Sequence, residues 1–139
     1  MIAVRPASLG DAEPVIELCQ QLGYTTNFAW IEESLKLQTT RVLLVVTEAD
    51  LVRGWIEVQE HFGIANGRIA LITGIVVDSE CRGQGLGKRL VRRAFDWARE
   101  RGLSTIRVRC QVKRTEAHEF YRACGFTEIK HQAVFESVV

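Results

Sequence analysis

Residues 75–90, IVVDSECRGQGLGKRL, decide how this chain is interpreted, because they join an apolar strand to an amphipathic helix through a glycine-rich loop. The glycines stand at positions 83, 85 and 87, where the missing Cβ lets the backbone approach a ligand and adopt positive φ angles. The helix begins near Lys88, and the free N–H groups and partial positive charge of a helix start favour an anion. The stretch predicts a phosphate-binding loop, although a structural turn between strand and helix would use glycines too.

Two common phosphate-binding motifs fit this loop poorly. A Walker loop needs Gly-Lys-Ser/Thr, and Gly87-Lys88-Arg89 lacks the hydroxyl that binds magnesium. A dinucleotide-binding fold places its glycines after the first strand, with an acidic residue about 20 positions further on. Here the loop follows the fourth expected strand, and Arg107 and Arg109 occupy the region where the acid would stand.

The pattern Arg/Gln-x-x-Gly-x-Gly/Ala does fit, with Arg82, Gly85 and Gly87. A second pattern, Ala-x-x-Phe-Tyr-x-x-x-Gly-Phe, follows about 30 residues later and is met by Ala117, His118, Phe120, Tyr121, Gly125 and Phe126. On these residues the chain resembles the GCN5-related N-acetyltransferase (GNAT) family. The resemblance is strong over residues 68–127, and the order of strands and helices extends it to most of the chain.

The resemblance implies that acetyl-CoA is the acetyl donor and assigns residues to bind it. The strand residues Ile75, Val76 and Val77 would pair with the pantetheine arm, and the Val77 N–H would point at the thioester oxygen. The pyrophosphate would lie on Arg82, Gly83, Gln84, Gly85, Leu86, Gly87 and Lys88, with Arg89 adding charge. Many relatives carry Asn seven residues before the tyrosine, where this chain has Arg114, so Arg114 either contacts a phosphate or is solvated.

The same resemblance makes Tyr121 the general acid that protonates the departing CoA sulfur. A tyrosine, with an ordinary pKa of about 10, holds its proton at neutral pH. The alternative is a purely structural role, in which Tyr121 packs in the core beside Phe120. For the general base, which must take a proton from the amine, Glu57 is the first candidate and Asp78 and Glu60 follow, although a carboxylate of this kind is more often only a surface charge.

The expected acceptor is a primary amine of a small molecule rather than a protein terminus. In the family, the segment that corresponds to Gly23–Leu35 forms a wall of the acceptor site. It offers aromatic side chains beside carboxylates, which suits a cationic amine: Tyr24, Phe28, Trp30, Glu32 and Glu33. Ordinary amphipathic packing would explain Phe28 and Ile31 as well. A non-catalytic module that binds or senses acyl-CoA is the alternative to an enzyme.

Hydrophobic periodicity predicts the remaining elements. The expected strands are Ile2–Arg5, Arg41–Thr47, Leu51–Glu60, Arg68–Val77, Ser104–Gln111 and one or two within Phe126–Val138. The expected helices run from Ser8 to Gly23, around Phe28–Leu35, over Gly87–Arg101 and over Glu116–Ala123. The fold class is therefore α/β (α+β), with three consecutive strands forming an antiparallel meander. The GNAT-like expectation is a mixed, strongly twisted sheet of six to seven strands flanked by about four helices.

Composition predicts one globular domain over residues 1–139, with 47% hydrophobic and 25% charged residues. No apolar stretch approaches the roughly 18 residues of a membrane span, and no secretory leader is evident, so we expect a cytoplasmic protein. Four cysteines without metal-binding spacing are expected to be reduced structural thiols, and no metal site is expected. A homodimer is compatible with these features.

The net charge of +1 is unevenly distributed along the chain. Residues 1–81 carry a net charge of −6, residues 82–122 carry +8, and residues 123–139 carry −1. The basic segment is either a set of solvated helix faces or a site for a polyanion. Because few aromatic side chains accompany these cations, we do not expect nucleic acid as a partner.

Overall fold

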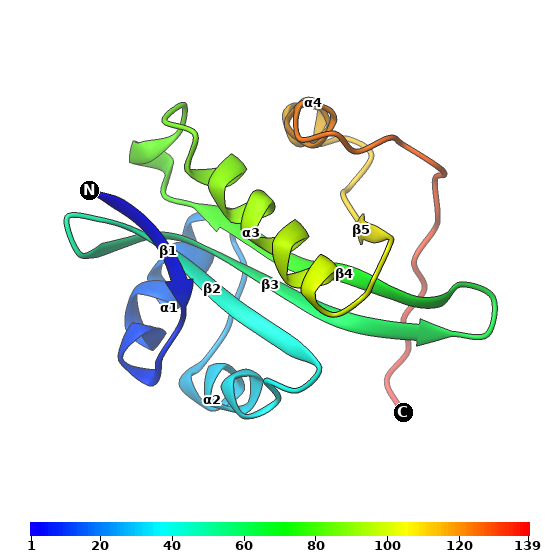
Figure 1. Cartoon of the computed structure of the whole chain (residues 1–139), viewed down its shortest axis with the longest axis horizontal. Helices are drawn as coiled ribbons and strands as arrows, with labels where there is room; N and C mark the ends of the chain where they lie inside the picture. The colour runs from blue at the N-terminus through cyan, green and yellow to red at the C-terminus, as the bar shows by residue number, and fades with distance from the viewer. The chain divides into compact units, whose positions relative to one another are not determined.

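A five-stranded mixed sheet is the centre of the computed structural model, which describes residues 1–139 (Figure 1). The chain forms two units, Met1–Val108 and Arg109–Val139, called here the first and second unit. The strands, all in the first unit, are β1 (Ile2–Pro6), β2 (Arg41–Glu48), β3 (Leu51–Gly63), β4 (Gly67–Val77) and β5 (Ile106–Val108). The helices are α1 (Ala12–Gln21), α2 (Phe28–Lys36), α3 (Leu86–Glu100) and, in the second unit, α4 (Thr115–Ala123), with the short 3-10 turns η1 (Leu9–Asp11) and η2 (Ser79–Cys81).

The strands follow one another across the sheet in the order β1-β2-β3-β4-β5. The first four are antiparallel, and β5 runs parallel to β4. Ala49 and Asp50 have positive φ angles of 52° and 65°, which match the two-residue hairpin turn that joins β2 to β3. The expected antiparallel meander of three strands is therefore confirmed.

Side chains of β2 alternate between two cores, one on each face of the sheet. Leu43 and Val45 pack against α1 and α2 in a buried apolar cluster. Val46 points to the opposite face, where α3 contributes the fully buried Leu90. Figure 1 shows α3 crossing one face while α1 and α2 lie on the other. The four expected helices are thus confirmed, and none of them has the length and apolar character needed to cross a membrane.

The outer edge of β4 is only partly covered by β5. The two strands pair over Ala70–Ile72, after which the chain of β5 leaves the sheet. At the same level the register between β3 and β4 shifts, because Val58 pairs with Ile72 and Glu57 with Gly74. Thr73 is the extra residue of this β-bulge. The edge of residues 73–77 that faces away from β3 therefore has no strand beside it.

The second unit holds one helix and a long segment without secondary structure. In α4 the Tyr121 ring meets Phe120 and Phe126 edge to face, with ring centroids 5.3 and 5.7 Å apart. Gly125, at φ 97°, ends the helix.

The prediction of final strands within Phe126–Val138 is wrong, and so is the total of six to seven strands. The strand expected over Ser104–Gln111 is also shorter, Ile106–Val108. Alternating side chains show that a segment can lie on a pleated surface, but a strand forms only where a neighbouring backbone pairs with it. All residues after Phe126 are exposed and gain no packing from extension.

Candidate functional site

The backbone of the glycine-rich loop presents a run of free N–H groups. No hydrogen bond within the chain involves the amides of residues 82–88, and the first helical bond of α3 runs from the Arg89 N–H to the Gly85 carbonyl at 3.2 Å. Gly83 and Gly85 hold positive φ angles of 83° and 77°, which turn the chain into the helix. The loop therefore has the donors that an anion needs, at the positive end of α3.

Several cationic side chains of the loop and of α3 have no acidic partner. Within α3 one ion pair forms, between Arg99 and Asp96 at 3.3 Å. The unpaired cations are Arg82, Lys88, Arg89, Arg92 and Arg93. Like charges four residues apart, and cations at a helix start, are unfavourable by a few tenths of a kcal/mol each. A bound anion would remove this repulsion, so the charges fit a ligand with several phosphate oxygens.

The strand residues Ile75, Val76 and Val77 lie on the part of β4 whose outer edge is open. The Asp78 N–H donates to the Arg53 carbonyl of β3 at 2.8 Å. Because successive amides of a strand point to opposite edges, the Val77 N–H points to the open edge. The structure thus supplies a free donor six residues upstream of Gly83.

Glu57 lies on β3 directly opposite Gly74, beside the bulge. Its carboxylate accepts hydrogen bonds from three elements: the Ser34 hydroxyl of α2, the Thr73 hydroxyl of β4 at 2.7 Å, and Arg41 of β2 at 3.3 Å. The side chain is mostly buried, with 20% exposure. An ionised carboxylate offers about four acceptor positions, so one remains for a ligand.

The other two carboxylates considered as bases have structural roles. Asp78 accepts the Glu80 N–H at 3.0 Å at the start of η2 and pairs with Arg53 at 3.5 Å. Glu60 binds Arg101 at 2.7 Å and Arg68 at 3.1 Å. The hydrogen bond from Arg101 is the main cause that lowers the pKa of Glu60. Both carboxylates therefore take part in ion pairs that join neighbouring elements.

The Trp55 ring lies over β4 at Gly74, the residue opposite Glu57. The sequence did not indicate this contact. A Cβ atom on Gly74 would come within 2.6 Å of the Trp55 ring, so the missing side chain at position 74 makes room for the indole. The ring also borders the buried Cys19 of α1, whose pKa is raised by burial. A tryptophan and a glycine on neighbouring strands, Trp55 and Gly74, could have indicated this contact. The sequence alone, however, does not determine how the two strands are aligned.

The aromatic side chains expected near the acceptor point largely into solvent. Tyr24, Phe28 and Trp30 are 51%, 50% and 61% exposed. Of the two acids, Glu32 pairs with Lys36 at 3.8 Å, and Glu33 is exposed. The residue that α2 brings to Glu57 is Ser34 instead.

The two remaining predicted site residues, Arg114 and Tyr121, belong to the second unit. Arg114 is exposed and precedes α4, where its carbonyl accepts the His118 N–H at 3.2 Å. Tyr121 lies in the last turns of α4 between two aromatic rings.

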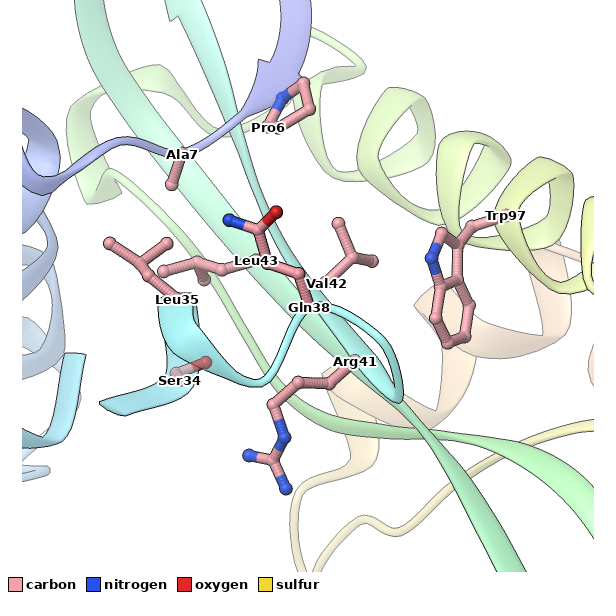
Figure 2. A pocket seen from close by; sticks show the side chains of 9 residues that line it. All are labelled: Pro6, Ala7, Ser34, Leu35, Gln38, Arg41, Val42, Leu43 and Trp97. Carbon is pink, nitrogen blue, oxygen red and sulfur yellow. The ribbon is translucent and has the colours of Figure 1, made fainter. Parts of the chain in front are cut away.

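A hollow at the sheet edge shares two residues with the Glu57 cluster (Figure 2). It lies where β1 ends at Pro6, opposite Leu44, so that the first residues of β2 are paired with a strand only on the β3 side. Its lining is Pro6, Ala7, Ser34, Leu35, Gln38, Arg41, Val42, Leu43 and Trp97. In Figure 2 the Arg41 guanidinium points away from Trp97. The glycine-rich loop contributes nothing to this hollow.

Comparison with known proteins gives one consistent result. The model of the acetyltransferase (GNAT) family matches residues 11–126. Glucosamine 6-phosphate N-acetyltransferase 1 of Oryza sativa subsp. japonica is 36% identical over 136 residues, which cover 90% of this chain and 81% of that protein.

Solved structures agree in fold. The crystal structure of glucosamine-6-phosphate N-acetyltransferase from Arabidopsis thaliana matches with a TM-score of 0.85 and 25% identity over 98% of both chains. AAC(6')-Iy, in complex with the bisubstrate analog CoA-S-monomethyl-acetylneamine, matches with a TM-score of 0.89 and 18% identity, covering 100% of this chain and 99% of that one. At that identity the second match shows the fold alone.

Proposed function

The chain belongs to the acetyltransferase (GNAT) family, and from that premise we propose that it moves an acetyl group from acetyl-CoA to a primary amine of a small molecule. The observation that carries the proposal is the set of unpaired amides at residues 82–88, beside five unpaired cations. A diphosphate fits such a set because each amide can donate to an oxygen without opposing charge. Arg114 is a further proposed phosphate contact.

The open edge of β4 suits the other end of the donor. When bound, acetyl-CoA supplies a thioester, whose carbonyl oxygen becomes negatively charged as the amine attacks. We assign the Val77 N–H to stabilise that charge, because it points to the open edge and is fixed by the strand. The other backbone groups of Ile75–Val77 at this edge would pair with the pantetheine arm.

Glu57 is the proposed general base. Its three protein donors orient the carboxylate beside Gly74 and leave one acceptor position. That position can accept an N–H of the incoming ammonium, or a water that relays its proton. Ser34 and Thr73 then act as positioning residues for Glu57.

Tyr121 is the proposed general acid. It occupies the tyrosine position of the family motif, and two rings pack edge-on against it and limit its rotation. A phenol in this role gives its proton to the sulfur of the leaving thiolate, which closes the proton balance of the reaction.

The proposed acceptor is a cationic small molecule such as an amino sugar. The rice and Arabidopsis relatives are named for glucosamine 6-phosphate, and one structural neighbour carries an acetylneamine group in its analog. A carboxylate that still has a free acceptor position suits an ammonium group of this kind.

Two measurements test the proposal. Calorimetric titration with acetyl-CoA at modest ionic strength should give binding heat, and its absence from folded protein would contradict the donor site. Thiol release should then be followed with a panel of amino sugars, aminoglycosides and a peptide amine. Turnover is expected with small amines, whereas binding without turnover across the whole panel would favour an acyl-CoA sensing module.

A further inference from the structure

A side-chain amide links the end of α1 to the turn that follows β4. Gln21 is the last residue of α1. Its Oε1 accepts the backbone N–H of Ser79 at 2.9 Å, and its Nε2 donates to the Asp78 carboxylate at 3.4 Å. These bonds join residues 57 and 58 positions apart in the sequence. The amide therefore uses both its acceptor and its donor on one turn.

The same turn is held from its other side by β3. The Asp78 N–H donates to the Arg53 carbonyl at 2.8 Å, and the Arg53 guanidinium lies 3.5 Å from the Asp78 carboxylate. Asp78 also accepts the Glu80 N–H at 3.0 Å. The turn is thus fixed by α1, by β3 and by its own backbone.

The position of this turn matters because it lies between the two proposed contacts of the donor. Val77 stands immediately before it, and the free amides of residues 82–88 follow after η2. A rigid spacing between these contacts must match the length of the pantetheine arm that joins a thioester to a diphosphate. A shift of the turn would misalign one end whenever the other end is bound.

We propose that Gln21 is a positioning residue that sets the spacing between the Val77 N–H and the diphosphate loop. The inference rests on the proposed function and extends it to a residue outside the family motifs quoted above. Gln21 is exposed and buries little apolar surface, so its contribution comes from the two hydrogen bonds rather than from packing. Its neighbour Gln20 is also exposed and forms no side-chain hydrogen bond, which makes it a matched control.

The test compares wild type, Gln21→Met and Gln20→Met with two donors, acetyl-CoA and acetyl-pantetheine, using a good amine acceptor. Methionine keeps the length of glutamine but removes both hydrogen-bonding groups. With acetyl-CoA, Gln21→Met should lower kcat/KM by about fivefold, because two solvent-exposed hydrogen bonds are lost and water replaces part of their contribution. Acetyl-pantetheine has no diphosphate, so its binding does not depend on the spacing between the two contacts. With this donor, both variants should have the kcat/KM of wild type.

Three other results would count against the inference. Equal losses with both donors would mean that Gln21 supports the strand or the fold in general, and an unchanged kcat/KM with acetyl-CoA would mean that it positions nothing. A loss of the same size in Gln20→Met would make the effect one of α1 as a whole. Wild-type protein inactive with both donors would instead contradict the proposed function, and thermal unfolding of each variant verifies that all are folded.

Discussion

The Tyr121 hydroxyl is the one side-chain group proposed to give a proton during the reaction. We expect Tyr121→Phe to lower kcat by about 100-fold or more, the usual contribution of a general acid. Binding of acetyl-CoA should be nearly unchanged, because the substitution removes one oxygen and keeps the ring. Steady-state thiol release and calorimetry measure the two quantities.

The chain offers a matched control, since its only other tyrosine is Tyr24. Tyr24 is half exposed, before α2, so Tyr24→Phe should keep wild-type kcat. If Tyr121→Phe retains kcat as well, water or another group protonates the sulfur and the assignment is wrong.

Asp11 is a buried acid whose ionised form is held by its neighbours. Arg5 donates to it twice, at 2.7 and 3.0 Å, and the Ser8 N–H donates at 2.8 Å. The hydrogen bond from Arg5 is the main cause that lowers the pKa of Asp11, although burial opposes it. Because the folded pKa lies below the unfolded value, this stabilisation is present above the unfolded pKa, about 3.9, and is lost as pH falls through the folded pKa.

We therefore expect Asp11→Asn to lower the free energy of unfolding at pH 7 by about 1–2 kcal/mol. The difference from wild type should shrink when urea unfolding is repeated below pH 4, as the wild-type carboxylate becomes protonated. Glu13→Gln, at an exposed acid of the same helix start, should change stability by less than about 0.5 kcal/mol. A pH-independent difference between wild type and Asp11→Asn would contradict this account.

At the scale of elements, the two ends of α3 provide a test of the diphosphate loop. Gly85 before the helix and Gly102 after it have φ angles of 77° and 74°, and a Cβ at either would meet nothing within 4 Å. Alanine at either position should cost a similar 1–2 kcal/mol or so of stability, since both must hold a left-handed backbone. Only Gly85→Ala should weaken acetyl-CoA binding in calorimetry, by about tenfold, because its Cβ would project into the space beside the amides proposed to hold the diphosphate. Equal affinities in the two variants would remove the loop from the donor site.

Local patterns were sufficient to predict most elements of the first unit. The meander could be predicted because its strands are rich in β-branched residues and are bounded by turn residues such as Asn66 and Gly67. The stripe Leu90, Val91, Ala94 and Ala98 of α3 is buried as its period requires, while Phe95 is only half-buried beside Arg99. The segment Phe126–Val138 failed because pairing depends on a partner strand, which alternation cannot reveal.

The sequence predicted those parts of the site that lie in one continuous stretch of residues. It did not predict the parts that require contacts between distant elements. The glycine-rich loop is such a stretch, and so is the strand before it. By contrast, Ser34 and Thr73 reach Glu57 from other elements, 23 and 16 positions away. Gln21 reaches Ser79 over 58 positions. Contacts of this kind follow from how strands and helices pack, which the sequence pattern does not encode locally.

At the scale of the whole molecule, charge is separated along the chain, with a net +8 on residues 82–122. We expect the KM for acetyl-CoA to rise with ionic strength, because salt screens the attraction between this segment and a polyanionic donor. Arg92→Gln should raise that KM by about threefold at low salt and reduce its salt dependence. Arg99→Gln, at a cation already paired with Asp96, should leave both unchanged. A KM that is insensitive to salt would mean that these cations do not attract the donor.

The proposed donor contacts of the first unit include main-chain groups of residues 75–77 and 82–88, whereas the contacts around Glu57 are side chains from separate elements. Binding of the donor by main-chain groups should not depend on side chains elsewhere in the protein. We therefore expect that acceptor preference can be changed without changing donor binding. Grafting residues 22–36 from a relative with a different amine specificity, with Gln21 left in place, should redirect the enzyme while its handling of acetyl-CoA is preserved.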